Sequence, residues 1–172
     1  MEAEALRLKY KPVEIRVLFV GESPPAGGTF FYAANSNLFR ATAAAFAQAF
    51  GSQVPGEPAF LEFFREAGCY LEDLCLEPVN HMATVDRTRS RKAGEHALPA
   101  RLKVHAPAVV IAVPMSVQAH VASALAQSGL AGVPLHGLPF PAMGHQRRFA
   151  TELVALLQEL RARGVLRIPS AI

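Results

Sequence analysis

The stretch Val17-Leu18-Phe19-Val20-Gly21-Glu22-Ser23-Pro24-Pro25 decides how the rest of the chain is interpreted. Four apolar residues that end at a glycine- and proline-rich segment are typical of a buried strand followed by a tight loop. In open α/β folds, the loops after the strands gather at the carboxyl edge of the sheet, where ligands bind. Because this loop carries the carboxylate of Glu22 and the hydroxyl of Ser23, it brings reactive groups to that edge.

An aromatic cluster follows the loop within a few residues. Phe30, Phe31 and Tyr32 precede Asn35 and Ser36, which open a helical pattern. A rigid polar loop beside aromatic rings is what binding a flat heteroaromatic ligand requires. The same spacing also suits a strand-loop-helix connection closed by a partly buried aromatic plug, and both interpretations stay open here.

Strands and helices alternate along the remainder of the chain. Expected strands cover residues 15–20, 69–76, 108–113 and 133–138, and expected helices cover 37–50, 58–67, 95–104, 116–127 and 146–163. A charged loop is expected before the helix at 95–104, and Ser36 or Asn35 is expected to cap the first helix. This order predicts a single domain over residues 1–172, a three-layer α/β/α sandwich around a four-stranded parallel sheet.

Length and composition suit such a domain. The chain has 172 residues, of which 51% are hydrophobic, enough for one sizeable core. No apolar run reaches the roughly 18 residues of a membrane span, and the acidic start Met1-Glu2-Ala3-Glu4 is unlike a signal peptide. We therefore expect a cytoplasmic monomer without membrane contact. Cys69 and Cys75 are the only cysteines, which favours two buried thiols over a disulfide or a metal site.

Basic residues are clustered rather than spread evenly. The net charge is +3 and the isoelectric point is about 9.1. The clusters are Arg87, Arg89, Arg91 and Lys92, shortly after Asn80, and Arg147 and Arg148, shortly after Gly144. Both follow expected sheet edges, where they suit contacts with the phosphates of a nucleic acid or nucleotide. An ordinary solvated surface is the alternative.

The order of these motifs resembles the uracil-DNA glycosylase superfamily, above all its mismatch-specific and thymine-DNA glycosylase branch. In that branch a G-I-N-P-G loop leads to an aromatic residue and then to an A-N-R-F helix start. The matching residues here are Gly21, Pro24, Phe31, Asn37 and Phe39. The resemblance covers residues 15–160, and it depends on the order of short motifs rather than on any one of them.

Three further segments extend the resemblance. Glu22 is similar to the glutamate in the G-E-A-P-G loop of the thermostable uracil-DNA glycosylases, although the four cysteines of their iron–sulfur cluster are absent. Residues 70–73 and 78–80 resemble the family's base-recognition strand and the P-P-x-N segment after it. Residues 138–144 resemble the H-P-S or N-P-S loop that reaches into the DNA.

The resemblance implies an enzyme of base-excision repair that acts on single-stranded or damaged duplex DNA without a cofactor. Such an enzyme flips a nucleotide into a pocket before it hydrolyses the N-glycosidic bond. Phe31 would then stack on the flipped base. Backbone N–H groups of residues 21–25 would bind the base and orient water. A carboxylate or amide beside the sugar and a donor at the departing base would stabilise the separated charges.

The sequence departs from the family pattern where activity is expected. Ser23 stands in place of the water-orienting Asp or Asn, and serine is a poor base without a partner. Asp73 stands in place of the Asn that reads uracil, and an ionised carboxylate only accepts hydrogen bonds. In the last loop, Phe140 and Ala142 replace the His or Asn and the Ser of the family, so that only Pro141 is kept.

These departures leave a defined set of candidate residues. Glu22 remains as the catalytic carboxylate, although a structural role in locking its loop is the alternative, and His145 or His136 could replace the missing imidazole. The catalytic candidates are Glu22, Ser23 and His145, and the base-binding candidates are Gly21, Pro24, Phe31, Asn37 and Asp73. The DNA-binding candidates are Asn80, Arg87, Arg89, Arg91, Pro141, Met143 and Arg147.

Two alternatives to a DNA glycosylase stay open. A protein of the same fold could bind damaged DNA, a nucleobase or a nucleotide without cleaving it. An unrelated α/β hydrolase could use Ser23 as its nucleophile. Ser23 lacks the G-x-S-x-G elbow, however, and the prolines after it have no N–H to donate to an oxyanion.

Overall fold

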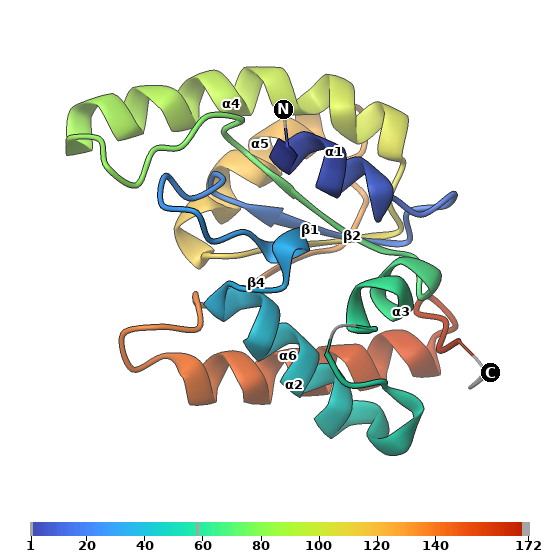
Figure 1. The fold of residues 1–172 in the computed structure, drawn as a ribbon. Coiled ribbons are helices and arrows are strands. Elements are labelled where there is room, and N and C mark those ends of the chain that lie inside the picture. Colours follow the sequence, from blue (N-terminus) through green and yellow to red (C-terminus); the bar gives the residue numbers. More distant parts are fainter. Residues whose placement is uncertain (1, 58, 170–172) are drawn as a thin grey trace.

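The fold is built on one four-stranded sheet in which every strand pairing is parallel (Figure 1). The computed structural model describes residues 2–57 and 59–169. The strands are β1 (Val17–Gly21), β2 (Cys69–Asp73), β3 (Val109–Ala112) and β4 (Leu135–Gly137), in the spatial order β2-β1-β3-β4. The prediction of a four-stranded parallel sheet is confirmed, although each strand is shorter than expected.

Helices cover both faces of this sheet (Figure 1). One layer contains α1 (Glu2–Lys9), α4 (Thr84–His105) and α5 (Gln118–Gln127), and the other contains α2 (Asn37–Phe50), α3 (Phe60–Glu66) and α6 (Gln146–Ala162). Three short 3-10 helices, η1 (Phe31–Ala33), η2 (Gly51–Gln53) and η3 (Met115–Val117), lie in the connections. The arrangement is that of a three-layer α/β/α sandwich, as predicted.

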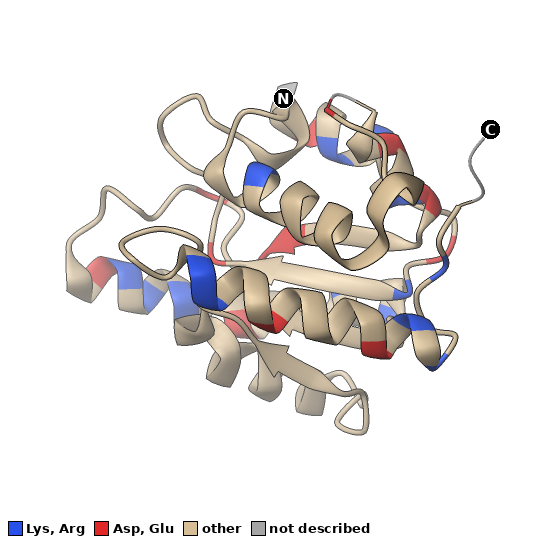
Figure 2. Ribbon diagram, turned by 90° about the horizontal axis from the view of Figure 1, so that it is seen from below, with Lys and Arg blue, Asp and Glu red and all other residues tan. Residues whose placement is uncertain are grey.

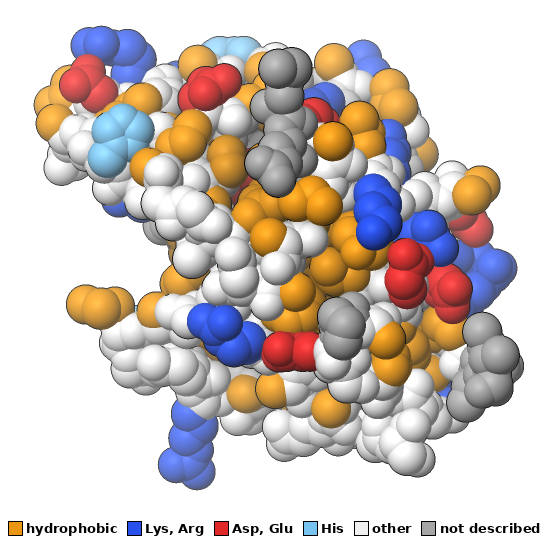
Figure 3. Space-filling model, in the orientation of Figure 1, with side chains coloured by type: hydrophobic (Ala, Val, Ile, Leu, Met, Phe, Trp, Pro, Cys, Tyr) orange, Lys and Arg blue, Asp and Glu red, His pale blue; other side chains and the backbone are white. Residues whose placement is uncertain are grey.

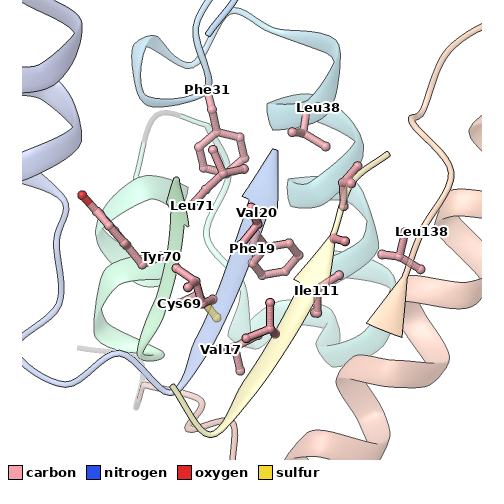
Figure 4. Close-up of a cluster of buried hydrophobic side chains, with 14 of the residues drawn as sticks. Val17, Phe19, Val20, Phe31, Leu38, Cys69, Tyr70, Leu71, Ile111 and Leu138 are labelled. Carbon is pink, nitrogen blue, oxygen red and sulfur yellow. The ribbon is translucent and has the colours of Figure 1, made fainter. Parts of the chain in front are cut away.

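The central strand β1 is buried along its whole length. It pairs with β2 on one side and with β3 on the other, and its side chains are almost fully covered from Val17 to Val20. A parallel strand that helices cover on both faces reads as a continuous apolar run, which is why this segment could be recognised in the sequence. Figure 4 shows Val17, Phe19 and Ile111 within this core, with Phe31 close to Leu71.

The helix α2 follows its sequence signals closely. Its bounds are those predicted, and the Ser36 hydroxyl accepts a hydrogen bond from the Phe39 N–H at 3.1 Å, a standard N-terminal cap. The buried rings of Phe39 and Phe46 pack against aromatic side chains of α3. This packing fixes the loop before α2 on the core.

The helix α4 corrects the prediction of a charged loop followed by a short helix. All of residues 84–105 form one helix, so the arginine cluster lies on a helix rather than on a loop. Few apolar residues mark this segment, and its helical periodicity is therefore weak. Tertiary contacts hold the helix in place, because Gly94 lies so close to the segment after β2 that an added Cβ would be 2.5 Å from the Leu74 carbonyl oxygen.

No helix in residues 2–57 and 59–169 combines the length and the apolar character that a membrane span requires. Cys69 and Cys75 are both buried and free. The described residues also contain no group of three or more His, Cys, Asp and Glu side chains that could hold a metal ion.

The hydroxyl of Tyr32 satisfies the outer edge of β2 and supplies a test of the fold. It donates to the Leu71 carbonyl at 2.9 Å and accepts from the Leu71 N–H at 2.7 Å. We expect Tyr32→Phe to lower the free energy of unfolding by about 1–3 kcal/mol, because two buried backbone groups lose their partner. Urea denaturation measures this value, and a loss below about 0.5 kcal/mol would show that water replaces the hydroxyl.

The buried carboxylate of Glu95 joins α4 to α5 and gives stability a pH dependence. It is bonded by Lys92, Ser123 and His120 at 2.6–2.8 Å, and these bonds lower its pKa to about 2. Its contribution is therefore complete above the ordinary pKa of a glutamate and is lost as the pH falls from about 4.5 to 2. Unfolding free energies over this range should fall less steeply for Glu95→Gln than for the wild type, whereas the exposed control Glu159→Gln should follow the wild type.

Candidate functional site

A cavity of about 520 Å³ opens at the carboxyl edge of the sheet, where β1, β2 and β3 end. Its wall combines the loop after β1, the start of α2, the ends of β2 and β3, and single residues from more distant loops. The lining residues are Gly21, Glu22, Ser23, Pro24, Pro25, Thr29, Phe30, Phe31, Ser36, Asn37, Leu38, Leu71, Asp73, Asn80, Arg87, Val113, Pro114 and Phe140. This volume lies within the usual range for small-molecule binding sites.

Asp73 is a buried carboxylate in the wall of this cavity. Its side chain is 6% exposed, and its Oδ2 accepts a hydrogen bond of 2.7 Å from Nη2 of the buried Arg7. Burial raises the pKa of Asp73 to about 6 although Arg7 opposes this rise. Because this value is below neutral pH, Asp73 is ionised under neutral conditions and acts as a hydrogen-bond acceptor.

Glu22, the second carboxylate, is held by two arginines of α4. Its Oε1 accepts from Nε of Arg87 at 2.7 Å and from Nε of Arg91 at 2.6 Å, and a second Arg87 nitrogen contacts Oε2. Burial alone would raise the pKa of Glu22, but the bonds from both arginines outweigh burial and lower it. The carboxylate is therefore ionised and closely neutralised, which weakens it as a general base.

Ser23 and Asn80 join the loop after β1 to the loop after β2. The Ser23 hydroxyl accepts from the Val79 N–H at 3.2 Å, and the Asn80 side-chain oxygen accepts from the Ala26 N–H at 3.1 Å. Neither Ser23 nor Asn80 has a histidine partner in these contacts. The structure therefore gives both side chains a clear part in shaping the cavity wall.

The aromatic side chains of the cavity differ in how far they are buried. Phe31 lines the cavity but is only 4% exposed, because the centre of its ring lies 5.2 Å from that of Tyr32, 5.8 Å from that of Phe39 and 5.3 Å from that of Phe64. The aromatic plug is thus observed, and a small part of the Phe31 ring also faces the cavity. Phe140, at 40% exposed, offers a more accessible ring.

Nine of the predicted site residues meet in this cavity. They are Gly21, Glu22, Ser23, Pro24, Phe31, Asn37, Asp73, Asn80 and Arg87. Arg91 reaches the site indirectly, through its bond to Glu22. The others do not line the cavity: His145 is exposed at the start of α6, Pro141 is buried, and Arg89, Met143 and Arg147 are exposed.

Several exposed residues lie around the opening of the site. Figure 3 shows a hollow on the left between the start of α4 and the loop before α6, with basic and apolar side chains on its sides. Met143 is 93% exposed in this loop. In the ribbon of Figure 2, Lys and Arg positions are grouped along the first half of α4 and at the start of α6. Several of these residues are already paired with carboxylates, since Arg89 bonds Asp86 at 3.2 Å and Arg148 bonds Glu152 at 2.7 Å.

Arg7, Phe30 and Phe140 are functional candidates that the sequence did not single out for the site. Arg7 precedes the first strand by ten residues and reaches Asp73 only because α1 packs near the end of β2. Phe140 was interpreted as the replacement for a polar family residue, and its ring lines the cavity instead. The only sequence signal for Phe30 was its place in the aromatic cluster.

Comparisons with protein-family models and with curated proteins found no match for this chain. The cavity itself therefore carries the functional interpretation. It joins an ionised acceptor, a neutralised carboxylate, exposed and buried aromatic rings, and an arginine within one concave site, a set that can bind a flat polar ring with a phosphate nearby.

Gly21 tests how tightly the floor of the cavity is built. A Cβ at this position would lie 2.4 Å from Oδ1 of Asp73, so Asp73 must move if a methyl group is added. We expect Gly21→Ala to lower the free energy of unfolding by about 1–3 kcal/mol. The matched control is Gly27→Ala, which meets nothing within 4 Å and should change stability by less than about 0.5 kcal/mol. Equal effects in urea denaturation would contradict this close approach.

Proposed function

We propose that this chain is a uracil-DNA glycosylase-like protein that hydrolyses the N-glycosidic bond of a flipped uracil or another damaged or deaminated base. The observation that carries the proposal is the cavity at the carboxyl edge of the sheet, with Asp73, Glu22 and aromatic rings in its wall. A base must leave the duplex before an enzyme can reach its glycosidic bond, so a pocket of base size is required.

Charge and shape around the cavity support DNA as the partner. Arg87 lines the cavity, and Arg89 of α4 and Arg147 of α6 are exposed, with Arg89 in an ion pair with Asp86. Arginines so placed would contact phosphates on either side of a flipped nucleotide. Met143, an exposed apolar residue of the loop before α6, is proposed to contact the bases that the flipped nucleotide leaves behind.

The aromatic wall supports a base as the ligand. Phe31 presents a small part of its ring to the cavity and is held rigidly by its neighbours, whereas Phe140 is free enough to cover a ligand. Stacking of a base on an aromatic ring contributes about 1–3 kcal/mol. We propose that these two rings hold the base while Asp73 reads its edge.

In the reaction, Glu22 is proposed to stabilise the positive charge that develops on the sugar. Its ionised form suits this role better than proton removal from water, because Arg87 and Arg91 already occupy its oxygens. Arg87 in turn is a donor within the cavity that could stabilise negative charge on the leaving base or on a phosphate.

The same pair of arginines favours a second candidate, a protein that binds a damaged base in DNA without cleaving it. Neutralisation of Glu22 removes much of the field that would stabilise a sugar cation. The exposed position of His145 also leaves the departing base without an imidazole. Recognition of a damaged base requires only the cavity, the aromatic rings and the basic surface. It does not require a group that activates water or stabilises the leaving base.

Single-turnover cleavage of labelled oligonucleotides distinguishes the two candidates. The strands carry uracil, hypoxanthine, xanthine or a mismatched thymine, and an unmodified strand is the control. We expect cleavage at one of these bases and at least a tenfold slower rate with Glu22→Gln, because the variant lacks the negative charge beside the sugar.

Binding to the same strands completes the experiment. Binding that prefers the modified base, without cleavage, would support the recognition protein. Equal binding to modified and unmodified strands, without cleavage, would refute both candidates. The variant Glu159→Gln on the distant part of α6 controls for the loss of a carboxylate elsewhere, and its rate should match that of the wild type.

A further inference from the structure

Arg7 lies behind the cavity wall and contacts two residues that line it. Its side chain is 7% exposed, and its Nη2 donates to Oδ2 of Asp73 at 2.7 Å. Its guanidinium carbon also lies 5.7 Å from the centre of the Phe30 ring. Arg7 does not itself line the cavity. The helix α1 thus supplies a cation that acts on the site through Asp73.

The other carboxylate oxygen of Asp73 faces a different environment. Oδ1 lies directly over Gly21, where an added Cβ would be 2.4 Å away, and both Gly21 and Asp73 line the cavity. Within the described residues, no hydrogen-bond donor reaches Oδ1. Arg7 therefore occupies one oxygen of the carboxylate, and the other is left as an acceptor at the floor of the cavity.

We propose that Arg7 is a positioning residue that determines specificity: it fixes Asp73 so that Oδ1 accepts a hydrogen bond from a base that carries a hydrogen on its ring nitrogen. This inference rests on the proposed function. Uracil and hypoxanthine have such a lactam N–H, whereas cytosine and adenine have a lone pair on the corresponding ring nitrogen. An acceptor at this point attracts the deaminated base and repels the ring nitrogen of its parent.

The geometry also determines what a proton would do at Asp73. Arg7 donates to Oδ2, so a proton on this carboxyl group has to reside on Oδ1, where it turns the acceptor into a donor. Other charged or titratable groups around Asp73 are Arg101, which donates to the Asp73 backbone carbonyl at 3.0 Å, the adjacent Glu72, Tyr32 and Cys75. Of the cations, Arg7 is the one that bonds the carboxylate itself.

Burial raises the pKa of Asp73 to about 6, and Arg7 opposes that rise. Above this pH, Oδ1 of Asp73 in the wild type accepts a hydrogen bond. Below it, the protonated Asp73 donates one instead. If Arg7 is replaced by a neutral side chain, the cation that lowers the pKa of Asp73 is lost while burial still raises it. Asp73 should then take up its proton at a higher pH. Binding of a lactam N–H should then be lost at a higher pH as well.

The test is equilibrium binding from pH 5 to 8 with an oligonucleotide that carries one 2′-fluoroarabino-uridine, whose fluorine makes the glycosidic bond resistant to hydrolysis. Twin strands carry 3-methyluracil, which lacks the N–H, or no modified base. We expect the affinity of the wild type for the uracil strand, relative to the unmodified strand, to fall about tenfold per pH unit below about 6. With Arg7→Met, the fall should begin at a higher pH, and Arg7→Lys should restore part of the wild-type profile.

Two further variants make the result specific. Asp73→Asn is nearly isosteric and keeps a carbonyl for Arg7, so it should turn an N–H₂ donor toward the ligand and lose both the uracil preference and the pH dependence. Arg163→Met removes an arginine that pairs with Glu159 on α6, and its profile should match that of the wild type. If Arg7→Met fails to fold by circular dichroism, Asp73→Asn and Arg7→Lys decide the question.

The outcomes separate the inference from the function on which it rests. If the wild type prefers the uracil strand but Arg7→Met has the same pH profile, or if 3-methyluracil binds as well as uracil, the role of Arg7 and Asp73 is refuted and the proposed function stands. If the wild type shows no preference for any modified strand at any pH, the proposed function itself fails.

Discussion

The parallel pairing of β1 with β2 is the constraint on which the site depends. Gly21 is the last residue of β1 and lies in register with Asp73, the last residue of β2. The pairing continues beyond the strands, because the Leu74 N–H donates to the Gly21 carbonyl and the Cys75 N–H donates to the Glu22 carbonyl, both at 2.8 Å. Two carboxylates from segments about 50 residues apart, Glu22 and Asp73, are thereby brought to one edge of the sheet, where both line the cavity.

Each of these carboxylates is paired with arginine from a different helix. Asp73 is bonded by Arg7 of α1, and Glu22 is bonded by Arg87 and Arg91 of α4. Removal of one partner from a buried ion pair leaves an uncompensated charge, which is costly, so these pairs couple the positions of the helices to the chemistry of the cavity. The two carboxylates differ in how many oxygens remain free: arginines bond both oxygens of Glu22, whereas Asp73 keeps one oxygen for a ligand.

Sequence patterns predicted the elements whose signals are local. The apolar run of β1, the Ser36 cap and the apolar stripes of α2 and α6 follow from spacing alone, and the structure confirms these elements. The first half of α4 escaped prediction, although a helix over 95–104 was expected, because the contacts that hold this helix are tertiary: Gly94 packs on Leu74 just after β2, and Glu95 bonds to α5. The arginines of its first half were recognised as a cluster, but the direction of Arg87 and Arg91 toward Glu22 depends on that packing.

The sequence by itself determined the α/β class, the four parallel strands and the position of the loop after β1 at the carboxyl edge, because burial on both faces and helical crossovers leave periodic signals in the chain. Only the tertiary structure decided what the polar groups at that edge do. Whether Asp73 is an acceptor, whether Glu22 is free, and how much of Phe31 faces the cavity depend on partners such as Arg7, Arg87 and Phe64. Those partners are distant in sequence, and long-range electrostatic and packing contacts leave no periodic pattern from which they could be inferred.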